Sequence, residues 1–185
     1  ETMMIMSSAF ETVLSEFGST DKLKKFVAES GVELREFLLQ QSSIVGALRL
    51  HSIRRGLNLK FKDLNFGEFY FEDPARIDLM ECVKCVLNKS QLYDIDATGL
   101  SEAVTIMLAD GHPTAELSCG HDTIALLQRM LRKSIGTISP SKVTEGVLHQ
   151  GFRLAYHMGC FSRSTLYSQL HEWQTRVNSV FLKIT

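Results

Sequence analysis

The stretch ELREFLLQQSSIVGALRLHSIRRG, residues 33–56, carries a long helical pattern that decides the fold class. Its apolar positions recur three and four residues apart, which is the spacing of one side of an α-helix. These positions are Leu34, Phe37, Leu38, Ile44, Val45 and Leu48, with Gln41 on the same side. Ser30 and Glu33 have the spacing of a capping box ahead of the pattern, and Gly56 is a typical residue after a helix end. We therefore expect a long amphipathic helix here, in a mainly α protein.

The same periodicity precedes and follows this stretch. Apolar stripes occupy residues 9–17, 23–27, 79–87, 100–108, 117–131, 143–155 and 166–180, with a break near Gly120. Helix starts are expected at Asp73-Pro74, Asp96 and Ser139-Pro140, and at Ser162 or Ser164, because short polar residues cap helices and proline suits a first turn. The sequence thus predicts a compact bundle of about seven to nine helices in one domain, residues 1–185, with any subdivision near residues 56–73.

The segment LNLKFKDLNFGEFYFED, residues 57–73, changes from helical periodicity to alternation. Apolar and polar residues alternate in its two halves, as expected of half-buried strands. Pairing Phe61 with Phe69 also opposes Lys62 to Glu68, so that apolar residues meet and charges complement each other. We therefore expect an antiparallel β-hairpin near residues 57–72, with its loop around residues 64–66.

Composition places the chain among ordinary globular proteins. Its 185 residues are 44% hydrophobic and 22% charged, with a net charge of -1. The longest nearly uncharged stretch, residues 37–48, is too short and too polar for a membrane span, so no membrane partner is expected. We expect no signal peptide, because the first residues of the sequence lack a cationic and then apolar pattern. Four cysteines without a secretory pattern favour a reducing compartment, the cytoplasm or the nucleus.

Two basic blocks raise the question of an anionic partner. Residues 49–62 contain five cations and no acidic residue, and further cations are spread over residues 129–176. If the blocks converge in the fold, they favour binding of RNA or single-stranded nucleic acid. The candidates are Arg49, Arg54, Arg55, Lys60, Arg132, Lys133 and Arg153. The structural alternative is stronger, because cations at helix C-termini complement the helix dipole and the lysines have acidic neighbours in the expected hairpin.

Cysteine and histidine offer the other chemistry. Cys82, Cys85, Cys119 and His121, in the segments CVKC and CGH, could supply four zinc ligands. However, CVKC lies in an expected helix and the C-x-H spacing is tighter than in known zinc motifs, so buried free thiols are the favoured interpretation. A Cys/His hydrolase is a weaker alternative, because neighbours in sequence need not have catalytic geometry. No cofactor other than zinc is indicated.

These observations together predict a non-catalytic helical module that binds another protein and self-associates. Aromatic side chains near the hairpin, Phe66 and Tyr70, are the expected exposed interface anchors, since aromatics supply much of the energy of interfaces. A nucleic-acid-binding protein is the first alternative, and a zinc-supported domain or Cys/His hydrolase is the second.

Overall fold

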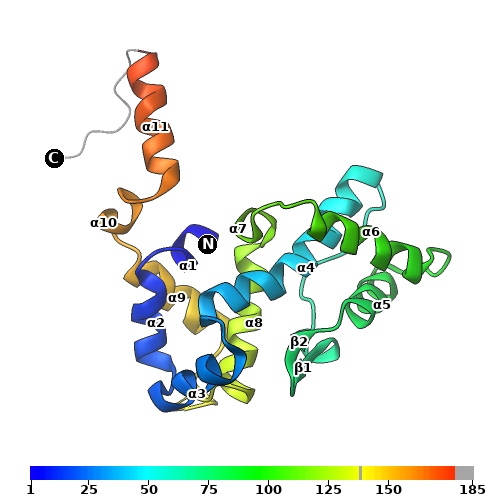
Figure 1. Cartoon of the computed structure of the whole chain (residues 1–185), viewed down its shortest axis with the longest axis horizontal. Coiled ribbons are helices and arrows are strands. Elements are labelled where there is room, and N and C mark those ends of the chain that lie inside the picture. The colour runs from blue at the N-terminus through cyan, green and yellow to red at the C-terminus, as the bar shows by residue number, and fades with distance from the viewer. Residues whose placement is uncertain (138, 178–185) are drawn as a thin grey trace.

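The long helix expected from residues 33–56 forms as α4, Leu34–Arg55, and runs through the middle of the molecule (Figure 1). The computed structural model describes residues 1–137 and 139–177. Within them, α4 packs against α3, α5, α6, α7, α8 and β2. Its buried residues include small ones, among them Ser42, Gly46 and Ala47, as well as the large apolar stripe. A helix buried on more than one side is expected when it is a central element of a bundle.

Over the described residues the fold contains eleven α-helices, eight of them with seven or more residues, and one antiparallel hairpin. The mainly α prediction is therefore confirmed. The helices besides α4 are α1 (Thr2–Ile5), α2 (Ala9–Phe17), α3 (Thr20–Ser30), α5 (Leu79–Ser90), α6 (Ala97–Ala109), α7 (Thr114–Leu117), α8 (Gly120–Lys133), α9 (Glu145–Ala155), α10 (Met158–Phe161) and α11 (Thr165–Arg176). A short 3-10 helix, η1 (Phe66–Glu68), precedes the strands β1 (Tyr70–Glu72) and β2 (Ala75–Ile77).

The helices gather on two sides of α4. On one side α1, α2, α8 and α9 pack together, and on the other α5 packs on α6 beside the hairpin (Figure 1). The buried apolar side chains of both sides belong to one continuous cluster. No helix of the described segments is both long enough and apolar enough to cross a bilayer.

The hairpin exists and includes part of the second expected strand, Tyr70–Glu72, but the first expected strand and the register were wrong. Tyr70 pairs with Ile77 and Glu72 with Ala75, so Asp73-Pro74 forms the turn and does not start a helix. Residues 57–62 have no strand partner within the described part of the chain: the N–H of Leu59 donates to Ser52 Oγ at 3.1 Å and that of Lys60 to Ser90 Oγ at 2.8 Å. Positive φ values at Asn58 and Asp63 break the extended conformation that the alternation had suggested.

Helix boundaries correct two other expectations. The Ser30–Glu33 capping box does not form: Gly31 ends α3 in the left-handed region, and Glu33 begins α4 without a side-chain cap. Helix α9 begins after Thr144 rather than at Ser139-Pro140. The expected starts at Asp96 and Ser164 are confirmed, because both side chains accept N–H bonds from their first turns. The last residue of the final stripe, Val180, lies outside the described residues.

Candidate functional site

Among the expected anion-binding residues, Arg49 has an internal role. Its guanidinium donates to the Asp122 carboxylate at 2.7 Å and lies 4.5 Å from the centroid of the Phe61 ring. The Asp122 side chain is only 4% exposed. Arg49 therefore neutralises a buried carboxylate and joins α4 to α8.

The other expected cations are exposed but lie on separate elements. Arg54 and Arg55 end α4 and share a pocket with His51 and with residues of α6. Burial lowers the pKa of His51, and the charges of Arg55 and Arg54 lower it further. Exposed Lys60 follows α4, Arg132 and Lys133 end α8, and Arg153 lies on α9 beside a different pocket. The described structure thus does not gather these seven residues in one pocket.

The two expected interface aromatics are not exposed. Phe66 and Tyr70 are 5% and 4% exposed and belong to the core. The Phe66 ring packs on Phe69 at 5.0 Å, and the Tyr70 hydroxyl shares a hydrogen bond with Ser134 at 3.2 Å. Burial raises the pKa of Tyr70. Phe66 in η1 and Tyr70 in β1 both pack into the core, so neither is an exposed anchor.

The four residues expected to share a zinc ion are not brought together. Burial raises the pKa of the Cys82 thiol, and burial together with Glu68 raises that of Cys85 to about 11. All four cysteines are free. Among the described side chains no hydrogen bond joins Cys119 to His121. Thiols held neutral by burial are poor metal ligands and poor nucleophiles, since both roles require the thiolate.

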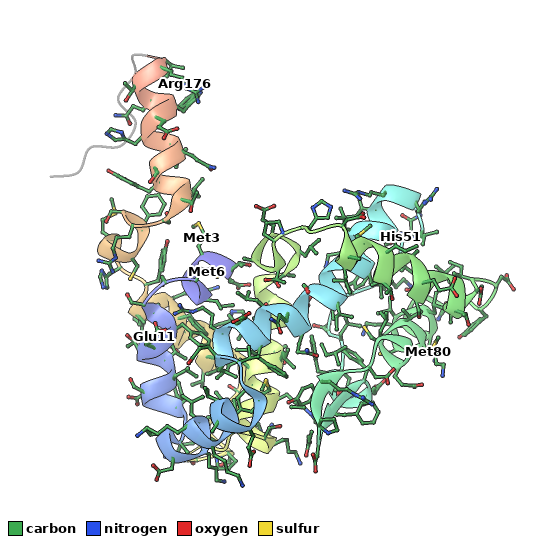
Figure 2. The ribbon with its side chains drawn as sticks, viewed as in Figure 1. Met3, Met6, Glu11, His51, Met80 and Arg176 are labelled. Atoms are coloured by element: carbon green, nitrogen blue, oxygen red, sulfur yellow. The ribbon has the colours of Figure 1, made fainter. Side chains whose placement is uncertain are left out.

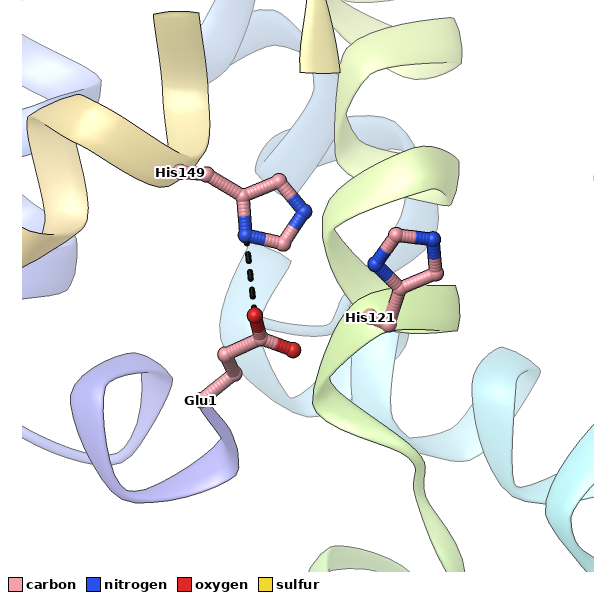
Figure 3. A group of neighbouring side chains, drawn as sticks. All are labelled: Glu1, His121 and His149. Carbon is pink, nitrogen blue, oxygen red and sulfur yellow. Dashed lines mark ion pairs between the residues drawn. The ribbon is translucent and has the colours of Figure 1, made fainter. Parts of the chain in front are cut away.

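His121 instead lies beside Glu1 and His149 (Figure 3). Glu1 precedes α1, His121 is in the first turn of α8, and His149 is on α9. Within the described ranges this is the one group of three or more metal-ligating side chains whose ligand atoms all lie within 4.8 Å. Sequence reasoning missed Glu1 and His149, because residues that lie ahead of α1, on α8 and on α9 are far apart in the sequence and leave no local spacing to detect.

A second feature is an apolar groove between α2 and α9, of about 480 Å³. Its walls include Phe17, Val147 and Leu154, and its floor includes Gly151, where an added Cβ would lie 3.1 Å from the Phe17 ring. Leu154 is 78% exposed, more than any other large apolar side chain of the described residues. Gly151 thus lets the Phe17 ring lie close to the α9 backbone, and exposed Leu154 adds an apolar side chain to the groove lining.

The third feature is α11, which projects away from the rest of the described fold (Figure 1). It has no buried residue, and Leu166 and Val177 are 41% and 46% exposed. Its first turn is tied to α10 by a perpendicular contact between Tyr167 and Phe161 at 5.5 Å. Leu166 and Leu170 of α11 fall on the same side as Val177, the residue directly after the helix, since their spacings are close to whole numbers of turns.

Comparison with models of known protein families, with curated proteins and with solved structures finds no match to this chain.

Proposed function

We propose that this chain is a helical interaction module that self-associates, with α11 of one copy docking in the α2–α9 groove of a second copy. The observation that carries the proposal is that one chain presents both parts of such a contact. It has an amphipathic helix without a buried residue and an open apolar groove that no described element fills.

The energetics of α11 favour a partner. The helix has 12 residues, and isolated helices of this length are marginal in water. Most helical stability in proteins comes from packing an apolar face, and the Leu166 and Val177 side chains are exposed on the chain that bears them. Each leucine or valine fully buried in a contact adds about 1.5–3 kcal/mol.

The connections direct this helix to another molecule. Helix α10 follows α9 after two residues, and α11 leaves α10 in a direction away from α2 and α9 (Figure 1). Residues of α2 and α9 line the groove, and α11 of the same chain points away from both helices. In a pair of copies, each α11 can fill the groove of the other, which is an isologous exchange.

Charge at the groove agrees with this occupant. Glu16 borders the groove from α2, which has no basic residue, whereas Arg176 lies in the last turn of α11. Figure 2 shows Arg176 at the end of α11 that is farthest from α10. Opposite charges at the rim steer and orient a contact whose affinity comes from the apolar centre.

Sedimentation equilibrium tests the proposal. Wild-type protein is expected to show a concentration-dependent mass above the 20.8 kDa of one chain. Leu154→Glu and Leu166→Glu each weaken association by at least about 10-fold, because each puts a charge in the apolar contact. Ile106→Glu is the matched control, since Ile106 is 65% exposed on α6, away from both surfaces.

Mixing the two variants identifies the contact. The Leu154→Glu copy keeps its helix and the Leu166→Glu copy keeps its groove, so the mixture regains one intact contact and associates more strongly than either variant alone. A wild type that is monomeric at every concentration contradicts the proposal. So does a mixture no stronger than its components, or an equal effect of Ile106→Glu.

A further inference from the structure

We propose that Glu1, His121 and His149 bind a divalent transition-metal ion, with zinc as the expected ion. The proposal is independent of self-association, because it depends on a different set of side chains. It differs from the cysteine site considered from the sequence and shares only His121 with it.

The geometry is close to that of a three-ligand site. Glu1 Oε1 lies 3.0 Å from His149 Nδ1, and the two imidazole rings stack with centroids 5.1 Å apart and planes 26° apart (Figure 3). One ligand atom from each residue lies within 4.8 Å of the others. Zinc bonds of 2.0–2.1 Å in a tetrahedron bring ligand atoms to about 3.3 Å. Rotation of the exposed His121 and Glu1 side chains supplies the remaining approach.

One ring nitrogen points independently to a ligand. Nε2 of His149 is buried and has no hydrogen-bond partner among the described atoms, while Nδ1 of the same ring faces Glu1. A buried nitrogen without a partner costs about 1–3 kcal/mol. Because only one of the two ring nitrogens carries a proton in a neutral imidazole, an ion between the rings and the carboxylate can bind the other nitrogen while Glu1 remains beside the group.

The chain holds Glu1 at this position through Gly120. An added Cβ at Gly120 would overlap the Cβ of Glu1 and lie 2.5 Å from the backbone nitrogen of Thr2. The Thr2 hydroxyl also donates to the carbonyl of Ser118 at 3.2 Å. Glycine at the start of α8 thus allows the N-terminal end of α1 to approach, and this contact brings the carboxylate to the two rings.

The ligand set selects the class of ion. Two imidazoles and one carboxylate suit zinc and its transition-metal neighbours, whereas magnesium and calcium prefer oxygen ligands throughout. Three protein ligands leave one coordination position open. A pocket of about 520 Å³ adjoins the group, and Arg153 and Gln150 line it. The open position therefore accepts water or a small anion, and the Arg153 charge favours the anion.

Titration of metal-free, untagged protein with Zn²⁺ tests the site by calorimetry, with Co²⁺ absorption as a report on coordination. One equivalent of Zn²⁺ is expected to bind. His121→Ala and His149→Ala each lower the affinity more than about 100-fold, because loss of even an outer partner of a ligand costs 10–100-fold. Glu1→Gln also lowers it. His112→Ala is the control, since His112 lies outside the group.

Helical content measured without metal shows whether each variant still folds. Gly120→Ala gives a second line of test, because it displaces Glu1 without removing a ligand and should weaken binding at least 10-fold. The proposal is overturned if wild-type protein binds no Zn²⁺ saturably, or if His112→Ala weakens binding as much as His149→Ala. It is also overturned if a Cys82→Ser, Cys119→Ser double variant abolishes binding while the histidine variants retain it.

Discussion

Gly46 lies where α4 crosses α7, and the two helices touch because this residue has no side chain. A Cβ at position 46 would overlap the carbonyl oxygen of Leu117. The contact brings together the buried hydroxyls of Ser42 and Ser118, which are 2.9 Å apart, and Thr123 Oγ1 lies 3.0 Å from Ser42 Oγ. The buried Ser42 hydroxyl of the central helix therefore finds partners in Ser118, at the end of α7, and in Thr123 of α8.

Gly46→Ala should lower the free energy of unfolding by about 3 kcal/mol, since overpacking against backbone forces the helices apart. Gly146→Ala is the control in another helix. Its added Cβ would meet nothing closer than 4.0 Å, so stability should stay the same or rise by up to about 1 kcal/mol. Urea unfolding followed by circular dichroism measures both. Equal stability of the two variants would show that α4 and α7 do not meet as described.

Single residues also show what the sequence could not reveal. The cluster of cations at residues 49–62 suggested a ligand surface, but the partner of Arg49 is Asp122, far along the chain. Likewise, His121 is two residues from Cys119 yet contacts Glu1 and His149 instead. The sequence shows which residues are neighbours along the chain. It does not show which residues are neighbours in space, because that depends on how α1, α8 and α9 pack. The favoured structural interpretation of Arg54 and Arg55, at the end of α4, agrees with their position in the last turn.

Helices were more predictable than the hairpin for a physical reason. The backbone hydrogen bonds of a helix form within the helix itself. Apolar periodicity, capping residues and a glycine after its end are therefore nearly sufficient to predict it. A strand depends on its partner, and residues 57–62 alternated without having one. Their buried Leu59 and Phe61 pack on the core while side chains of Ser52 and Ser90 accept the backbone N–H bonds. The alternation of apolar and polar residues in 57–62 therefore predicted the burial of the apolar residues correctly and the strand pairing incorrectly.

The start of α5 provides a test at the scale of the element. The Asp78 side chain accepts a hydrogen bond from the Glu81 N–H at 3.0 Å, whereas Asp73 is in the hairpin turn. Asp78→Ala should therefore destabilise the protein by about 1 kcal/mol, the usual cost of losing such a cap. Asp73→Ala, at an exposed position, should change stability by less than about 0.5 kcal/mol. Chemical unfolding curves compare the two variants. A larger loss of stability in Asp73→Ala than in Asp78→Ala would indicate that the helix starts at Asp73-Pro74, as expected from the sequence.

Across the whole molecule, α9 connects the two proposed sites. His149 faces Glu1 and His121, while Val147, Gly151 and Leu154 face the groove. Gln150 lines both the pocket beside the metal ligands and the groove. A metal ion would join α9 to α1 and α8, and a docked α11 would cover α9 on its other side. Metal binding and α11 docking both stabilise the folded state, because the ion and the docked helix bind the folded chain and not the unfolded one.

Thermal unfolding separates the two events. Zinc at 100 times its dissociation constant contributes about 2.7 kcal/mol, which for a chain of this size raises Tm by about 5–10 °C. That rise should vanish in His149→Ala and persist in Leu154→Glu. Raising the protein concentration without zinc should raise the Tm of the wild type and of His149→Ala, but not that of Leu154→Glu. Calorimetry at several concentrations, with and without zinc, measures both dependences. If zinc still raises the Tm of His149→Ala, only the proposed metal site is contradicted. If the Tm of Leu154→Glu still rises with protein concentration, only the proposed α11 contact is contradicted.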